Sequence, residues 1–199
     1  GANKLAAELN ELAGRTVAFG VAVNVTDEES VKAMIAEIVL TAGGIDLFVS
    51  NAGVLKAGSV KELSLRDFEF VTNVNYTGFF LCTKHVAPVM EAMNRPTGSY
   101  FTDIISISSK SALEGSNKNG AYAGSKFGTV GLVQSFAKEL VTDNTKVNTV
   151  CPGNFFDGPL WSDPDRGLFT QYLAAGKVPG ATTIAGVRAF YEAQVPMNR

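Results

Sequence analysis

Three side chains near the middle of the chain have types and spacing suited to proton transfer. Lys126 follows Tyr122 by four residues, and Ser109 lies thirteen residues before the tyrosine. A tyrosine hydroxyl has a pKa of about 10, but a lysine one helical turn later lies on the same helix face, where its ammonium favours the phenolate. Tyr122 could then exchange a proton with an alcohol or carbonyl oxygen, while the Ser109 hydroxyl holds and polarises that oxygen.

This chemistry suits hydride transfer, in which an oxygen gains or loses a proton as its carbon gains or loses a hydride. A bound cofactor must supply or accept the hydride, because no side chain can do so. Taken alone, the Tyr-x-x-x-Lys spacing is also compatible with a packed tyrosine beside a solvated lysine, since it occurs by chance in many helices. The surrounding motifs therefore have to decide between the two interpretations.

The hydrophobic pattern predicts the elements that would position these residues. Strands are expected over 15–25, 45–50, 101–108 and 145–153, and helices over 1–14, 26–44, 65–93, 121–140, 165–176 and 182–193. Because strands that alternate with helices form βαβ units, we expect one α/β domain over residues 1–199, with a parallel sheet and helices on both faces. Ligands bind such sheets at the carboxyl ends of the strands.

Polar or small residues do follow the predicted strands, at Asn24, Asn51–Gly53, Ser109 and Pro152–Gly153. The small residues of Asn51–Gly53 would let backbone approach a ligand closely, or they form a plain tight turn. Asn75 lies inside the helical pattern of 65–93, where a polar side chain marks either a helix bend or a member of a proton relay.

Composition excludes several classes of protein. The net charge is −2 and no block of Lys or Arg stands out, so we expect no nucleic-acid partner. The longest apolar runs are far too short to span a bilayer, so we expect no membrane partner. Cys82 and Cys151 are isolated, which favours reduced thiols in a cytoplasmic protein. The single histidine, His85, cannot build a His-rich site, and no metal site is predicted.

In combination, the order of the motifs resembles that of the short-chain dehydrogenase/reductase family over essentially the whole chain. The residues that carry the resemblance are Asn51-Ala52-Gly53, Asn75, Ser109, Tyr122, Lys126 and Pro152-Gly153. It implies a Rossmann-type, doubly wound sheet that binds NAD, with NADP as an open alternative. It also implies that Tyr122 is the general acid/base, that Lys126 lowers the tyrosine pKa and binds the nicotinamide ribose, and that Ser109 orients the substrate oxygen.

The same resemblance assigns further residues to the cofactor and to a relay. The cofactor would lie along Asn24, Val25, Asn51, Ala52, Gly53, Tyr122, Lys126, Pro152 and Gly153. Asn75 would hold a water-linked relay to solvent. The family usually has Asp where this chain has Asn24, and an Asn carbonyl can still accept the hydrogen bond of the adenine amino group.

Two features of the family are absent from this sequence. They are the glycine-rich phosphate-binding turn after the first strand and the residue after the second strand that selects between NAD and NADP. We therefore expect the chain to lack the first βαβ portion and the last strand of the fold. It would then belong to a longer polypeptide, or be a fragment that binds a dinucleotide poorly.

The loops after Ser109 and Pro152 are most similar to those of family members that act on sugar-alcohol phosphates. The predicted activity is hydride transfer between the nicotinamide cofactor and a secondary alcohol or ketone of a polyol or sugar phosphate. Besides Ser109 and Tyr122, the substrate would meet Asn119 through a hydroxyl and Lys110 through the phosphate, with Lys118 as the second candidate cation.

Two alternatives stay open. One is a non-catalytic dinucleotide-sensing or scaffold protein of the same fold, and the other is a reductase of a different carbonyl substrate, such as a 3-oxoacyl thioester. The family resemblance also implies a homotetramer or dimer built partly on helices 65–93 and 121–140. The apolar surface of the second helix, which would contribute to that interface, consists of Val130, Leu132, Val133, Phe136 and Ala137.

Overall fold

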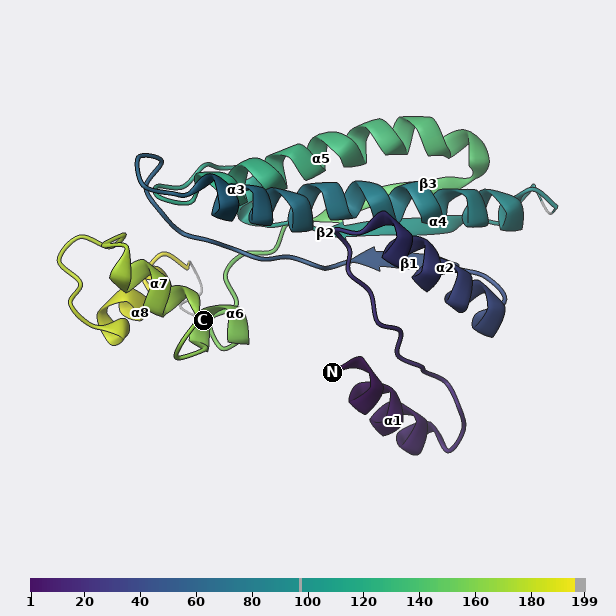
Figure 1. Cartoon of the computed structure of the whole chain (residues 1–199), viewed down its shortest axis with the longest axis horizontal. Coiled ribbons are helices and arrows are strands. Elements are labelled where there is room, and N and C mark those ends of the chain that lie inside the picture. The colour runs from purple at the N-terminus through teal and green to yellow at the C-terminus, as the bar shows by residue number, and fades with distance from the viewer. Residues whose placement is uncertain (97, 196–199) are drawn as a thin grey trace. The chain divides into compact units, whose positions relative to one another are not determined.

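The computed structural model describes residues 1–96 and 98–195, which form two compact units (Figure 1). The sheet unit combines Gly1–Ala52, Thr77–Ser106 and Leu132–Asn148. The site unit combines Gly53–Tyr76, Ile107–Gly131 and the described residues from Thr149 onwards. Each unit has its own apolar core.

The sheet has three strands in the order β1-β2-β3, namely β1 (Leu47–Ser50), β2 (Thr102–Ile107) and β3 (Thr145–Val150). β1 and β2 are parallel, with Leu47 opposite Asp103 and Ser50 opposite Ser106. The strands predicted over 45–50, 101–108 and 145–153 are thus confirmed. Within the described residues, β1 forms one edge of this sheet.

Helices α1 (Ala2–Ala13), α2 (Glu28–Ala42) and α4 (Gly78–Asn94) belong to the sheet unit. The Asp27 side chain accepts hydrogen bonds from the first free N–H groups of α2, and Gly43 ends that helix in a left-handed conformation, as its position predicts. α2 packs against α4, which also contacts β1 (Figure 1). The core between them contains Val31, Ile35, Phe79, Val86, Met90, Ile104 and Val147.

The helix predicted over 65–93 is real but irregular. It consists of α3 (Leu65–Thr72), a π-helical turn over Asn73–Thr77, and α4. A π turn inserts one extra residue into the helical repeat, and such turns often occur at functional sites. Asn75 lies at the centre of the turn and is only 3% exposed. The polar residue in the apolar pattern thus does mark a helix irregularity.

The predicted helix over 121–140 is confirmed as α5 (Gly120–Leu140). Its second half packs against the core of the sheet unit through Leu132, Val133, Phe136 and Ala137. Val133 is buried in that core, and Leu132, Phe136 and Ala137 are partly buried against it, so most of this apolar surface is used within the chain. The homotetramer or dimer stays a prediction.

The site unit contains three short helices, α6 (Pro159–Ser162), α7 (Leu168–Ala174) and α8 (Ile184–Glu192), of which α7 and α8 pack together (Figure 1). Aromatic rings fill the core between them. The Trp161 ring centroid lies 5.0 Å from those of Phe156 and Phe169 and 5.2 Å from that of Tyr191. The predicted helices over 165–176 and 182–193 are confirmed, whereas α6 is too short to have produced a periodic pattern.

The prediction of a strand over 15–25 is wrong. The segment is irregular, and Val17, Phe19 and Val23 are 39–46% exposed. A β-branched run forms a strand only where a neighbouring backbone pairs with it. In this structure the segment pairs with the Asn10 side chain and not with a strand. The Asn10 Oδ1 accepts from the N–H groups of Val17 and Ala18 at 2.7 and 2.8 Å, and its Nδ2 donates to the Ala18 carbonyl at 2.9 Å.

None of the helices in the described part of the chain has both the length and the apolar character needed to cross a membrane.

Candidate active site

The structure brings Ser109 and Tyr122 into direct contact. Ser109 follows β2 and begins a single 3-10 turn over Lys110–Ala112, where its hydroxyl accepts the N–H of Ser111 at 3.1 Å. Tyr122 lies in the first turn of α5 and packs against the aromatic core of the site unit. The Ser109 side chain hydrogen-bonds to the Tyr122 hydroxyl. The two hydroxyls that sequence reasoning selected therefore meet although the whole loop separates them.

Lys126 lies one helical turn after Tyr122 and is 5% exposed. Its ammonium is 5.7 Å from the centroid of the Tyr122 ring and donates a hydrogen bond to the Ile107 carbonyl at 2.8 Å. A lysine ammonium has three donors, so this bond leaves two for other partners. The last residue of β2 therefore holds the Lys126 ammonium near the Tyr122 ring.

The pKa values of this pair differ from the expectation that the lysine lowers the tyrosine pKa. Burial raises the pKa of Tyr122 above its usual value, and the hydrogen bond from Ser109 opposes that rise. Burial also lowers the pKa of Lys126, opposed by the charge of Cys151. The ammonium is directed at the Ile107 carbonyl, so in the chain by itself desolvation outweighs the attraction between the two side chains.

Asn75 joins the start of the site unit to α5. Its Oδ1 accepts the N–H of Val54 at 2.8 Å, and its Nδ2 donates to the Val54 carbonyl at 2.9 Å and to the Ser125 hydroxyl at 3.1 Å. Ser125 in turn donates to the Tyr122 carbonyl at 2.7 Å. Ser125 was missed by sequence reasoning, although its position between Tyr122 and Lys126 could have pointed to it.

The residues predicted to line the cofactor fall into both units. Asn24, Val25, Asn51 and Ala52 belong to the sheet unit, whereas Gly53, Tyr122, Lys126, Pro152 and Gly153 belong to the site unit. Asn51, Ala52 and Gly53 are all exposed directly after β1. The Pro152 carbonyl accepts the N–H of Lys110 at 2.9 Å, which ties the segment after β3 to the turn that carries Ser109.

Asn24 makes local bonds. Its Oδ1 accepts from the N–H of Thr26 at 3.1 Å and from the Thr26 hydroxyl at 2.8 Å. A carbonyl oxygen has two lone pairs, so both are engaged within the turn. The expected bond from an adenine amino group would have to displace one of them.

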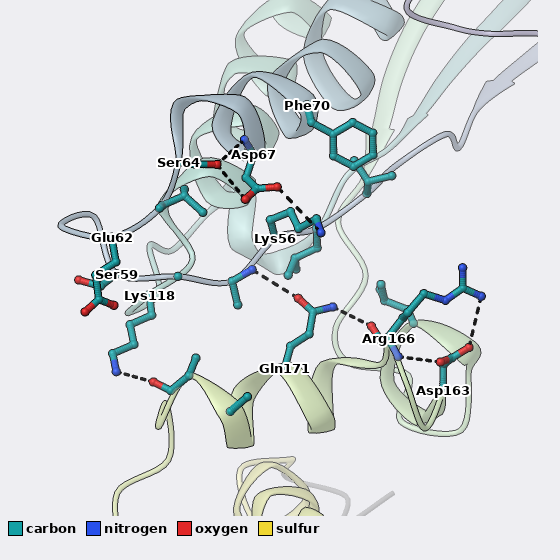
Figure 2. A pocket seen from close by; sticks show the side chains of 18 of the residues that line it. Lys56, Ser59, Glu62, Ser64, Asp67, Phe70, Lys118, Asp163, Arg166 and Gln171 are labelled. Carbon is teal, nitrogen blue, oxygen red and sulfur yellow. Dashed lines mark hydrogen bonds and ion pairs between the residues drawn. The ribbon is translucent and has the colours of Figure 1, made fainter.

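One cavity of the site unit has a volume of about 1010 Å³ and lies between the segment after Gly53 and the segment of α6 and α7. Figure 2 shows Lys56 facing Asp67, and their Nζ and Oδ1 atoms are 3.9 Å apart. The Gln171 side chain reaches toward Arg166, and its Nε2 donates to the Arg166 carbonyl at 2.7 Å. Lys118 also lines this cavity, and its ammonium donates to the Ala175 carbonyl. The predicted second phosphate ligand is therefore already bound to backbone.

A smaller cavity of about 280 Å³ borders Tyr172, which belongs to the aromatic core against which Tyr122 packs. Lys110 and Asn119 line it, together with Tyr172 and Lys177. The Tyr172 and Tyr122 hydroxyls are close enough for their charges to interact, which adds to the burial and the Tyr191 charge that raise the pKa of Tyr172. Sequence reasoning missed Lys177, which lies in no recognisable motif.

Known proteins are similar to this chain over its full length. A model of the short chain dehydrogenase family matches residues 1–161. Sorbitol-6-phosphate 2-dehydrogenase of Escherichia coli (strain K12) is 33% identical over 199 residues, which are 100% of this chain and 71% of that protein. The 3-oxoacyl-[acyl-carrier-protein] reductase FabG of Thermotoga maritima is 35% identical over 137 residues, which are 69% of this chain and 53% of that protein. The chain thus spans about half the length of the latter relative.

Solved structures of dehydrogenases are also similar to this chain. Sorbitol-6-phosphate 2-dehydrogenase SrlD from Erwinia amylovora has a TM-score of 0.88 and 34% identity, covering 100% of this chain and 72% of that chain. NAD⁺-bound xylitol dehydrogenase has a TM-score of 0.89 and 27% identity with the same coverage. ElxO with NADP bound has a TM-score of 0.70 and 26% identity, covering 89% and 62%.

These similarities confirm the predicted Rossmann-type α/β fold and the predicted likeness to a family member that acts on a sugar-alcohol phosphate, namely sorbitol-6-phosphate 2-dehydrogenase. They leave both NAD and NADP as cofactors of similar proteins. The assignment of residues 1–199 to a single NAD(P)-binding domain stays a prediction, as does the cytoplasmic location.

Proposed function

The chain belongs to the short-chain dehydrogenase family, whose members are NAD(P)-dependent oxidoreductases acting on CH–OH groups, and we propose that its own substrate is a polyol phosphate. The reaction would interconvert a secondary alcohol and its ketone, as in sorbitol 6-phosphate. Two features support this choice over other carbonyl compounds. They are the likeness to sorbitol-6-phosphate 2-dehydrogenase and the lysines and polar side chains that line the cavity bordering Tyr172.

The observation that carries the proposal is the contact between Ser109 and Tyr122. Lys126 lies one helical turn later, with its ammonium 5.7 Å from the centroid of the tyrosine ring. When bound, NAD(P) accepts a hydride from the alcohol carbon or returns one to the ketone carbon. In the oxidation, Tyr122 takes the proton of the substrate hydroxyl, and Ser109 donates a hydrogen bond to the same oxygen. In the reduction, Tyr122 gives the proton back. Lys126 stabilises the phenolate in both directions.

Residues of the site unit fit the ribose end of a nicotinamide cofactor. Lys126 has two free donors after its bond to Ile107, and the Tyr122 hydroxyl lies on the same helix face. A Cβ placed on Gly153 would meet no atom within 4 Å, so the backbone there is open to a ligand. We therefore assign Tyr122 and Lys126 to the ribose hydroxyls, and Gly53, Pro152 and Gly153 to the backbone surface along the cofactor.

Asn75 acts as a positioning residue in this scheme. Its side chain uses both amide hydrogens and holds Val54 and Ser125, which supports the segment after Gly53 and the turn of α5 between the tyrosine and the lysine. Its place in a water-linked proton relay stays a prediction.

The function is tested by following the absorbance of the reduced nicotinamide with a panel of polyols, polyol phosphates and a 3-oxoacyl thioester, each with NAD and with NADP. We expect a polyol phosphate to have the highest kcat/KM. Turnover of the thioester alone would replace the proposal by the acyl reductase activity that the FabG relative performs. Cofactor binding without turnover of any substrate would favour the sensor or scaffold alternative.

A further inference from the structure

The cavity that borders Tyr172 is lined by two lysines from distant parts of the chain. Lys110 comes from the 3-10 turn directly after Ser109, and Lys177 comes from the segment that follows α7. Both line the cavity of about 280 Å³, together with residues of the loop over 111–119 and of α8. One wall of this cavity therefore begins at the serine that contacts the reacting tyrosine.

Lys177 is held in place by uncharged partners. Its ammonium lies 4.0 Å from the centroid of the Tyr172 ring and donates a hydrogen bond to the Ser116 hydroxyl at 3.1 Å. Glu114 also lines the cavity. Among the ion pairs of residues 1–96 and 98–195, however, none involves Lys110 or Lys177. Lys177 is partly buried and Lys110 is exposed at the edge of the same cavity, and neither is ion-paired among the described residues.

The electrostatics of the cavity reflect this arrangement. Burial, and after it the charge of Lys110, lower the pKa of Lys177 to about 8. Charged groups that leave water are normally paired, and a like charge nearby disfavours the charged form. An anion bound by both ammonium groups would offset the desolvation of Lys177 and its repulsion by Lys110.

A third residue that lines the cavity, Asn119, has a polar atom without a hydrogen-bond partner among the described residues. The Asn119 side chain is 2% exposed, and its Oδ1 is buried without a hydrogen-bond partner among the described residues. An acceptor of this kind suits a hydroxyl donor and repels a phosphate oxygen. The cavity therefore offers cations for an anionic group and an acceptor for a hydroxyl, which is the combination that a phosphorylated polyol carries.

Building on the proposed polyol-phosphate activity, we propose that Lys110 and Lys177 bind the substrate phosphate together in this cavity, while Asn119 accepts a hydrogen bond from a substrate hydroxyl. Ser116 orients Lys177 through their hydrogen bond. Lys118 has no part in this site, because its ammonium is bound to the Ala175 carbonyl and it lines other cavities. The second phosphate ligand is therefore Lys177.

The first experiment compares KM values for a polyol phosphate and for the same polyol without phosphate. Lys177→Gln and Lys110→Gln should each raise the KM for the phosphorylated substrate by about 10–100-fold, because each removes a charge-assisted contact. Neither should change the KM for the unphosphorylated polyol by more than about twofold, and Lys177→Arg should restore most of the affinity. Lys61→Gln, an exposed lysine of the same unit, is the neutral control.

Two results of this experiment would overturn the proposal. One is an equal rise of KM for both substrates in Lys177→Gln, which would make the lysine a support of the loop. The other is a rise for Lys118→Gln as large as that for Lys177→Gln, which would return the phosphate to the residue that the sequence indicates.

The second experiment measures binding of inorganic phosphate by calorimetry to the inactive Tyr122→Phe protein, with and without Lys177→Gln. We expect phosphate affinity to fall about tenfold or more with the second substitution. If phosphate binds through the lysines but no polyol is turned over, the activity is refuted and the anion site stands. If polyols are oxidised but phosphate does not bind, the anion site is refuted and the activity stands.

The affinity for inorganic phosphate should also decrease as the pH rises from about 7 to about 9, because Lys177 then loses its proton. The titratable groups that face it are Lys110, Glu114, Tyr172 and Tyr191. Lys177→Arg should abolish most of this dependence, since arginine stays charged. A pH dependence that is the same in both proteins would contradict the role of Lys177.

Discussion

Asn75 holds the peptide groups of Val54 from both sides. One side-chain atom accepts the Val54 N–H at 2.8 Å, and another donates to the Val54 carbonyl at 2.9 Å. A residue of a neighbouring strand would make the same pair of bonds, so the side chain replaces a strand just after β1 has ended. The π-helical turn provides the local geometry, and the low exposure of Asn75 shields these bonds from water.

Replacing Asn75 should therefore destabilise the chain. Asn75→Ala leaves both peptide groups of Val54 without a partner and should lower the free energy of unfolding by about 1–3 kcal/mol. Asn75→Asp keeps an acceptor for the Val54 N–H, but it places a buried carboxylate against the Val54 carbonyl and should destabilise the chain at least as much as Asn75→Ala. Chemical denaturation measures the effect. An unchanged midpoint for Asn75→Ala would show that the bonds carry no net stability.

Tyr122→Phe should remove nearly all turnover without changing the fold. The variant loses only the hydroxyl that moves the proton, and loss of a general acid/base costs on the order of 10²–10⁴-fold in rate. Steady-state kinetics and circular dichroism are the measurements. Tyr100→Phe, which removes a hydroxyl in the sheet unit, is the matched control and should keep its activity. Turnover of Tyr122→Phe within a few-fold of the parent would exclude Tyr122 as the acid/base.

Lys126→Met should move the pH profile of alcohol oxidation to higher pH. Oxidation needs the phenolate, and burial already raises the pKa of Tyr122. Without the nearby cation that pKa should rise further, so the rising limb of the profile should shift upward by about 1–2 pH units. The cofactor Kd should increase at the same time, because the ribose loses a donor. A profile that coincides with that of the parent would refute the electrostatic role.

Glu28 links the N-terminus of α2 to α4 in a pH-dependent way. Its carboxylate accepts from Lys84 at 2.7 Å and contacts the His85 ring nitrogen at 2.8 Å. The hydrogen bond from Lys84, followed by that from His85, lowers the pKa of Glu28 to about 2. A carboxyl with a depressed folded-state pKa stabilises the fold above its unfolded pKa, and this contribution is lost as the pH falls through the folded value.

Glu28→Gln should accordingly lower the Tm by a small amount at neutral pH. The difference from the parent should shrink between about pH 4.5 and about pH 2, where the parent loses the same interaction. Thermal scans across this range measure it. Glu29→Gln is the control, because Glu29 contacts Lys32 on the same helix and makes no bond between helices. A Tm difference that persists unchanged at pH 2 would contradict the assignment.

Two glycines of the site unit should respond to alanine in opposite directions. A Cβ on Gly167 would collide with the carbonyl oxygens of Asp163 and Trp161, which are backbone atoms and cannot move aside. Gly167→Ala should cost about 1–3 kcal/mol. Gly131 lies inside α5 with open space around its Cβ position, so Gly131→Ala should add about 0.5–1 kcal/mol. Chemical denaturation measures both effects, and equal free energies of unfolding for the two variants would contradict this prediction.

Much of the fold could be predicted because its signals are local. α2 begins at an aspartate that caps free N–H groups and ends at a glycine with φ of 87°, and both are visible in the sequence. The segment over 15–25 has an equally clear strand pattern, yet forms none. Pairing depends on a second backbone, and a one-dimensional pattern contains no information on whether that backbone is there.

The candidate site also contains residues that local sequence signals identify and residues that only the fold reveals. Ser109, Tyr122 and Lys126 could be selected because motif order and helical spacing place them. The Ser116–Lys177 bond joins residues 61 positions apart, and nothing near Lys177 in the sequence points to it. Lys118 was the second candidate cation after Lys110, and only the fold shows that its ammonium is bound to the Ala175 carbonyl.

The position of β1 at the edge of the sheet has a consequence for samples of this chain in solution. Leu47 and Val49 are 53% and 47% exposed, and β1 pairs on one side only among the described residues. An apolar strand with an unpaired side is a template on which another extended segment can add. A second copy of the chain can supply such a segment, so self-association should grow with protein concentration and be relieved by a charged residue in place of Val49.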